Sequence, residues 1–304
     1  MDYILETYSL KKDYGNYKAL NGLNMKVPKG AIYGFVGKNG AGKTTLIRLI
    51  CGLQKPSEGG YSLYGCRNTD KSIREVRKRL GAIIETPAIY SHMSAIENME
   101  AQYRILGVPY QNEIQELLEL VGLGGTAHKK VKDFSLGMRQ RLGIAIALAG
   151  SPDFLILDEP VNGLDPQGII EIRELIMRLN KEYGITMLIS SHILDELAKI
   201  ATHFGFIDHG QILKELSAEE LSKHTRKCLR LTLTDTKAVC MILDEWGIEY
   251  SILSQHEVDI FGDIKITELV LKLSQVGCEV QGMQEHDESL ENFYINLVGG
   301  HHYA

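Results

Sequence analysis

One segment near the N-terminus has the composition of a loop that binds phosphate, Gly37-Lys38-Asn39-Gly40-Ala41-Gly42-Lys43-Thr44. It matches the pattern GxxxxGK[ST] at every fixed position. Small residues let backbone N–H groups turn toward phosphate oxygens, and the N-terminus of a following helix adds partial positive charge. We expect Lys43 to reach the β- and γ-phosphates of ATP and the Thr44 hydroxyl to ligate Mg²⁺. Thr45 completes the predicted nucleotide-binding segment.

Two acidic residues, Asp158 and Glu159, end the apolar run Phe154-Leu155-Ile156-Leu157. Side chains alternate along a strand, so the two acids point in different directions. We expect Asp158 to support Mg²⁺ through water. Glu159 can face the γ-phosphate as general base or polarise the attacking water. Alone, such a pair is often the solvated start of a loop, but together with a phosphate loop it indicates ATP hydrolysis.

The elements that must position these residues alternate between strand and helix up to about residue 213. Short apolar runs at 31–36, 154–157 and 187–190 are typical of strands buried on both faces of a parallel sheet, and 43–52 reads as a helix. Segments 96–106, 113–121 and 135–148 all read as helices. They predict a helical subdomain at about 92–150, inserted in the α/β body.

The pattern changes after about residue 216. Segments 228–234, 250–253, 258–261 and 279–283 read as strands, and 237–246 and 266–276 as helices. The order β-α-β-β-α-β suggests a small ferredoxin-like unit. With 304 residues, the chain is expected to form two domains, at 1–215 and 216–304.

Composition excludes several classes of function. The net charge of −6 argues against nucleic acid as a partner, and the short basic cluster at 223–230 reads as a solvated face or linker. Five scattered cysteines favour neither a disulfide framework nor a zinc site, and they fit a reducing compartment. The acidic start does not resemble a signal peptide, and the apolar stretch at 142–150 is too short to cross a membrane. The adjacent His301 and His302 read as a chain end rather than a metal site. We therefore expect a cytoplasmic protein whose membrane role, if any, comes through a partner.

The segment Ser135-Leu136-Gly137-Met138 resembles the LSGGQ signature of ABC ATPases. Ser135 and Gly137 are kept, whereas Leu136 and Met138 depart from it, and an ordinary helix N-cap is the alternative. Other features of that family follow in order. Gly163-Leu164-Asp165 resembles the D-loop. His192 resembles the switch histidine, and Tyr14 resembles the aromatic residue that stacks on adenine.

This resemblance implies a P-loop NTPase fold, an ABC cassette with a RecA-like α/β core, an antiparallel β portion and a helical subdomain. It also implies a homodimer in the ATP-bound state, in which the signature of one copy acts in trans on the nucleotide of the other. The cassette would power separate transmembrane permease subunits, at the inner face of the plasma membrane. The alternatives are a soluble ABC ATPase without a transporter, a chromosome-maintenance ATPase and a nucleotide-dependent regulator. The chain has only one cassette, which disfavours the soluble ABC ATPase. It has no sustained heptads, which disfavours the chromosome-maintenance ATPase.

One position departs from most of that family. The strand at 80–84 ends in Glu85, at 42 residues after Lys43, where most members carry a glutamine that contacts Mg²⁺ and water. A carboxylate can itself bind the metal, and we expect Glu85 to act as a catalytic residue that supports hydrolysis in place of the glutamine. This glutamate and the Ser-Leu-Gly-Met signature are similar to the ATPases of bacitracin and lantibiotic resistance exporters, which implies export of a peptide antibiotic or similar compound. The alternative is that Glu85 is a surface acid.

Overall fold

The computed structural model describes residues 2–224, 228–262, 264–286 and 290–300. The chain divides into two compact units, Met1–Ala218 and Glu219–Ala304. This division lies three residues beyond the boundary that the sequence suggests. Each unit has its own hydrophobic core.

A six-stranded sheet in the order β11-β10-β4-β9-β8-β7 forms the centre of the first unit. Five strands are parallel and β11 pairs antiparallel with β10. Every residue of β4, β8 and β9 is buried, which explains the apolar runs at 32–36, 154–157 and 187–189. The strands are β4 (Ile32–Val36), β7 (Leu80–Ile83), β8 (Phe154–Asp158), β9 (Thr186–Ser191), β10 (His203–Asp208) and β11 (Gln211–Ser217).

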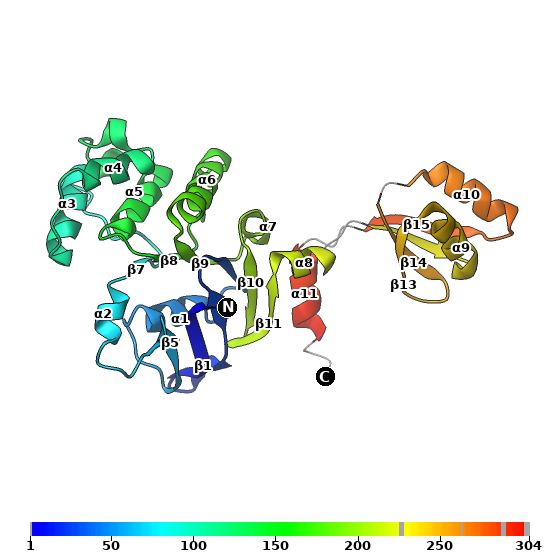
Figure 1. Ribbon diagram of the computed structural model, residues 1–304, viewed down its shortest axis with the longest axis horizontal. Helices are drawn as coiled ribbons and strands as arrows, with labels where there is room; N and C mark the ends of the chain where they lie inside the picture. The colour runs from blue at the N-terminus through cyan, green and yellow to red at the C-terminus, as the bar shows by residue number, and fades with distance from the viewer. Residues whose placement is uncertain (1, 225–227, 263, 287–289, 301–304) are drawn as a thin grey trace. The chain divides into compact units, whose positions relative to one another are not determined.

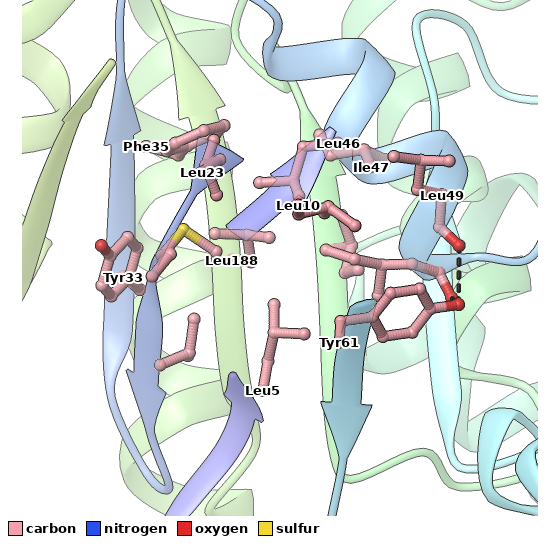
Figure 2. Close-up of a cluster of buried hydrophobic side chains, with 14 of the residues drawn as sticks. Leu5, Leu10, Leu23, Tyr33, Phe35, Leu46, Ile47, Leu49, Tyr61 and Leu188 are labelled. Atoms are coloured by element: carbon pink, nitrogen blue, oxygen red, sulfur yellow. Dashed lines mark hydrogen bonds between the residues drawn. The ribbon is translucent and has the colours of Figure 1, made fainter. Parts of the chain in front are cut away.

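A second, antiparallel sheet comes mainly from the N-terminal region. It contains β1 (Tyr3–Tyr14), β2 (Tyr17–Leu23), β3 (Lys26–Pro28), β5 (Glu58–Leu63) and β6 (Cys66–Arg67). Side chains from both sheets meet those of α1 (Lys43–Ile50) in one core cluster, as Figure 2 shows for Leu5, Leu46 and Leu188. This core fixes the helix that follows the phosphate loop.

Two polar side chains hold the C-terminal end of α1. The Tyr61 hydroxyl donates to the Leu49 carbonyl at 2.8 Å, the dashed bond in Figure 2. Arg77, the last residue of α2 (Ile73–Arg77), donates through Nε to the Ile50 carbonyl at 3.1 Å and also bonds the Tyr61 hydroxyl. Carbonyls at a helix end lack partners within the helix, so these bonds anchor α1.

The helical subdomain consists of α3 (Ala95–Leu106), α4 (Glu113–Leu120) and α5 (Leu136–Leu148), which lie together in Figure 1. Ser94 and Glu97 form a capping box at the start of α3. The longer α6 (Pro166–Tyr183) and the short α7 (Leu194–Ala198) return the chain to the sheet. None of the helices in the described part of the chain is long and apolar enough to span a membrane.

The second unit contains a four-stranded antiparallel sheet in the order β13-β14-β12-β15. With α9 and α10 this gives the order β-α-β-β-α-β, and each element lies within about three residues of its predicted range. The helices α8 and α11 were not predicted, and His301 and His302 lie outside the described residues. The elements are α8 (Ala218–His224), β12 (Cys228–Leu233), α9 (Thr236–Trp246), β13 (Glu249–Ile252), β14 (Glu257–Phe261), α10 (Ile266–Gln275), β15 (Val280–His286) and α11 (Leu290–Gly300).

Candidate functional site

The candidate site lies at the carboxyl ends of the parallel strands, where α/β sheets commonly bind ligands. The loop between β4 and α1 contains Gly42 with φ of 112°, a conformation that favours glycine. A Cβ added there would lie 2.6 Å from the Ala19 carbonyl oxygen, so no larger residue fits without movement. The loop borders a cavity of about 200 Å³, lined by Tyr17, Lys38, Asn39, Gly40, Gly42, Lys43, Thr44, Thr45 and Glu159.

Lys43 is the buried cation of this cavity, with 6% of its side chain exposed. Its Nζ donates to the Gly37 carbonyl at 2.6 Å and lies 3.5 Å from Oε1 of Glu159. The ammonium is therefore held at the loop, where it can bind phosphate oxygens.

Asp158 is almost fully buried, and both of its carboxylate oxygens have partners. Oδ2 accepts from the Thr44 hydroxyl at 2.9 Å, and Oδ1 accepts from the Ser190 hydroxyl. The sequence predicted Asp158 and Thr44 as residues of a Mg²⁺ site, and the structure brings them together. A hydroxyl and a carboxylate are hard oxygen ligands, and such a pair fits Mg²⁺, which usually keeps several waters and binds substrate phosphates. Ser190 was not singled out, although a serine near the end of a buried apolar strand is a signal for such a role.

Glu159 lies between Lys43 and His192. Its Oε2 is 2.7 Å from Nδ1 of His192 and also accepts from the His192 backbone N–H at 3.3 Å. The backbone N–H of Glu159 donates to Ser190 at 3.1 Å, and its φ of 52° turns the chain out of β8. The arrangement holds one carboxylate beside a loop cation and a histidine.

The signature segment and the D-loop segment lie close together. Ser135 is the N-cap of α5, and its hydroxyl accepts from the Met138 N–H at 3.2 Å. Leu136 is half-exposed, and a Cβ added at Gly163 would lie 3.4 Å from its side chain. Asp165 is the N-cap of α6 and accepts from the Gly168 N–H at 3.2 Å. In this chain Ser135 thus has the capping role that the sequence left as the alternative, and Gly137 lies in the first turn of α5.

Two tyrosines lie near the phosphate loop. The Tyr14 hydroxyl donates to Oε1 of Gln54, and the ring lies 5.1 Å from Nζ of Lys12. Tyr17 lines the cavity, and its hydroxyl donates to the Gly40 carbonyl at 3.0 Å. Sequence reasoning missed Tyr17, although it is an aromatic residue three positions after Tyr14.

Glu85 follows β7 and is not among the residues that line the phosphate cavity. It has φ of 62°, and its side chain, 59% exposed, contacts Arg48 of α1 with 2.6 Å between Oε1 and Nη2. The sequence did not indicate Arg48 as a partner.

A larger cavity, about 590 Å³, lies beside β7 and the helical subdomain. Its residues come from α2, β7, α3, α5 and the segments next to them, and they include the cationic Arg74 and Lys78. The apolar part includes Ile83, Pro87 and Ile146.

Comparisons with known proteins agree with this geometry. A family profile described as ABC transporter matches residues 20–162. The bacitracin transport ATP-binding protein BcrA of Bacillus licheniformis is 42% identical over 306 residues, which covers 99% of both chains. The lantibiotic transport ATP-binding protein SrtF of Streptococcus pyogenes is 47% identical over 212 residues, covering 70% of this chain and 90% of SrtF. The solved dimeric structure of MJ0796, a bacterial ABC transporter cassette, matches with TM-score 0.64 and 25% identity, covering 70% of this chain and 98% of that one.

Proposed function

This chain belongs to the ABC transporter family as an ATP-hydrolysing nucleotide-binding subunit, and from that premise we propose that it powers export of a peptide antibiotic or similar compound. Similarity to BcrA along almost the whole chain supports this cargo class, together with the similarity of the first unit to SrtF. These similarities favour a transport subunit over a soluble ABC ATPase or a nucleotide-dependent regulator.

The observation that carries the proposed mechanism is the meeting of Lys43, Glu159 and His192 at the phosphate loop. Lys43 and the loop N–H groups bind the β- and γ-phosphates of ATP. Glu159 orients the attacking water and accepts its proton, while His192 holds the Glu159 carboxylate in place. Thr44 and Asp158 are the proposed Mg²⁺ residues, with Glu85 as a further candidate. A metal held there would supply positive charge that offsets the charge of the phosphates.

We propose that two copies pair in the ATP-bound state. Ser135, Leu136, Gly137 and Met138 of one copy would then face the nucleotide of the other, with the N-terminus of α5 directed at the γ-phosphate. Asp165 would lie at the interface between the copies. The description of MJ0796 as a dimeric cassette supports this pairing.

The proposed contact with separate membrane subunits is the cavity of about 590 Å³. It has an apolar lining and three cationic residues, Arg74, Arg77 and Lys78, so it fits a short amphipathic helix that carries an acidic side chain. This placement keeps the protein at the inner face of the plasma membrane through its partner. Substituting Arg74→Glu should reduce recovery of the protein with membranes that contain the permease, while ATP binding persists.

Hydrolysis and dimerisation of the purified protein test the central proposal. We expect slow Mg²⁺-dependent turnover in the wild type and a loss of about 10²- to 10⁴-fold in Glu159→Gln, the range for removal of a general base. That variant should remain dimeric in ATP by light scattering. Absence of ATP binding in both proteins would contradict the proposal.

Sensitivity of cells to antibiotics tests the cargo class. Deletion of the gene should increase sensitivity to bacitracin or to a lantibiotic, and the wild-type copy should restore resistance whereas Glu159→Gln should not. Unchanged sensitivity to both classes would contradict a role in peptide-antibiotic export.

A further inference from the structure

The ion pair between Arg48 and Glu85 connects the helix of the phosphate loop with the end of β7. Nη2 of Arg48 lies 2.6 Å from Oε1 of Glu85, and the two side chains are 37% and 59% exposed. The contact is between segments 37 residues apart in the chain. An exposed pair of this kind is readily broken and re-formed.

Both partners lie on segments that also carry, or adjoin, the proposed metal residues. Arg48 follows Thr44 by four residues in α1, so it lies about one turn further along the same face of the helix. In the sheet, Ile83 of β7 pairs with Leu157 of the parallel β8, so both strands end at the same side of the sheet, the carboxyl ends of the strands. Glu85 and Asp158 therefore leave neighbouring strands at that side, and Arg48 can reach the first of them.

The backbone conformation of Glu85 indicates that the direction of its side chain is important. Its φ of 62° is uncommon for a residue other than glycine and is a strained conformation. Glu159, at the end of the adjacent strand, shares this feature with φ of 52°. Strained conformations of this kind gather at sites where a side chain must point in a defined direction.

A carboxylate cannot be fully available to a metal and to a guanidinium at the same time. Glu85 is a hard oxygen donor of the type that Mg²⁺ prefers, and Arg48 offers charge-assisted hydrogen bonds to the same oxygens. In the structure, the Glu85 carboxylate is bound by Arg48. If the Glu85 carboxylate is to bind the metal, it must therefore first break its ion pair with Arg48.

We propose that Arg48 is a positioning residue that competes with the divalent metal for the Glu85 carboxylate and so tunes metal affinity at the phosphate loop. The proposal rests on the proposed function, since it assumes a metal–ATP complex at Thr44 and Asp158. It adds a residue on α1, Arg48, that controls when Glu85 is available to bind the metal.

Binding of Mn²⁺ with ATP, followed by electron paramagnetic resonance, tests the competition apart from turnover. Mn²⁺ suits the same oxygen ligands as Mg²⁺, and all proteins carry Glu159→Gln so that ATP persists. Arg48→Gln should tighten Mn²⁺ binding by about two- to fivefold, the range for an exposed ion pair. Arg48→Lys, which keeps the positive charge, should have a Mn²⁺ affinity closer to that of the parent.

A double-mutant cycle with Glu85→Gln separates competition from a general field effect. The tightening by Arg48→Gln should disappear when Glu85 is absent. Arg178→Gln, which breaks a similarly exposed ion pair with Glu182 on α6, is the matched control and should leave Mn²⁺ affinity unchanged.

Equal effects of Arg48→Gln with and without Glu85 would overturn the proposal and leave the proposed function intact. No change from Arg48→Gln in the parent would overturn it likewise. Failure of the parent to bind ATP at all would instead overturn the proposed function, and this inference with it.

Discussion

Nδ1 of His192 lies 2.7 Å from Oε2 of Glu159, although 33 residues separate them in the chain. The two residues follow β8 and β9, which are adjacent and parallel. The same carboxylate lies 3.5 Å from Lys43 at its other oxygen. Glu159 is thus held from two sides.

Removing the imidazole should misplace this carboxylate. We expect His192→Ala to lower kcat for ATP hydrolysis on the order of 100-fold, the typical cost of a displacement of about 1 Å at a reacting group. Nucleotide affinity should change little, because Lys43 and the loop remain. Steady-state kinetics beside His128→Ala, an exposed histidine of the helical subdomain, would check this prediction. Equal losses in both variants would contradict it.

Ser190 should support both the metal site and the fold. Ser190→Ala removes the donor to Oδ1 of Asp158 and leaves a buried carboxylate oxygen without its partner. The loss should be about 1–3 kcal/mol of the free energy of unfolding, with weaker Mg²⁺ dependence of ATP binding.

A buried hydroxyl elsewhere provides the comparison for this substitution. Ser62 is buried in the antiparallel sheet and contacts the Tyr8 hydroxyl. Ser62→Ala should affect thermal stability without changing Mg²⁺ dependence. If the two variants respond to Mg²⁺ alike, Ser190 has no specific role at Asp158.

The capping box of α3 should give stability that depends on pH. The Ser94 backbone N–H and Lys130 both donate to Glu97, and these bonds hold the pKa of Glu97 below its ordinary value of 4.5. Because the folded-state pKa is depressed, the stabilisation is complete above pH 4.5 and is lost as the pH falls through the lower folded-state pKa. Melting temperatures of wild type and Glu97→Gln should differ at pH 7, approach each other as the pH falls below 4.5, and meet below the folded-state pKa. A difference that grows on acidification would contradict this assignment.

Tyr14 and Tyr17 can be separated by paired substitutions. If Tyr14 stacks on adenine, Tyr14→Phe should keep ATP affinity, and Tyr14→Ala should lose about 1–3 kcal/mol, or roughly 5- to 150-fold. At Tyr17, the Tyr17→Phe change removes only the hydrogen bond to the Gly40 carbonyl and keeps the ring. It therefore separates the effect of that bond on ATP affinity from the effect of the ring. A large loss in Tyr17→Ala with none in Tyr14→Ala would assign stacking to Tyr17. Fluorescent ATP titrations would give these affinities.

The two units should be separable. A protein ending at residue 218 should keep ATP affinity within about twofold, because all proposed nucleotide residues precede residue 193 and the first unit has its own core. Loss of binding on truncation would show that the second unit contributes to the site.

Local patterns were sufficient to predict much of this fold. Four of the five parallel strands, the helix after the phosphate loop and the helical subdomain were marked by short apolar runs, glycines or helical periodicity, whereas β10 was not located. The family resemblance then gave the α/β cassette that the comparisons confirm. In the second unit, alternation in 228–233 gave the strand directly, because Leu229, Leu231 and Leu233 face one core.

The remaining features depend on contacts between distant segments. The antiparallel sheet was not located strand by strand, because β1 mixes exposed and buried positions without strict alternation. The sequence does not indicate Arg48, because its partner Glu85 lies 37 residues away, just after β7, nor Ser190, because its role arises from the register of β8 and β9. A single sequence indicates the residues of a motif better than the partners that orient them.

The two bonds that fasten the C-terminal end of α1 have a mechanical consequence. Tyr61 and Arg77 bond the last carbonyls of α1, so these contacts oppose movement of the helix along its own axis. Arg77 belongs to the short α2, which also contributes Arg74 to the larger cavity. α1 and α2 would therefore connect the phosphate loop with the surface that we propose for the membrane subunit, so nucleotide binding at one could be sensed at the other.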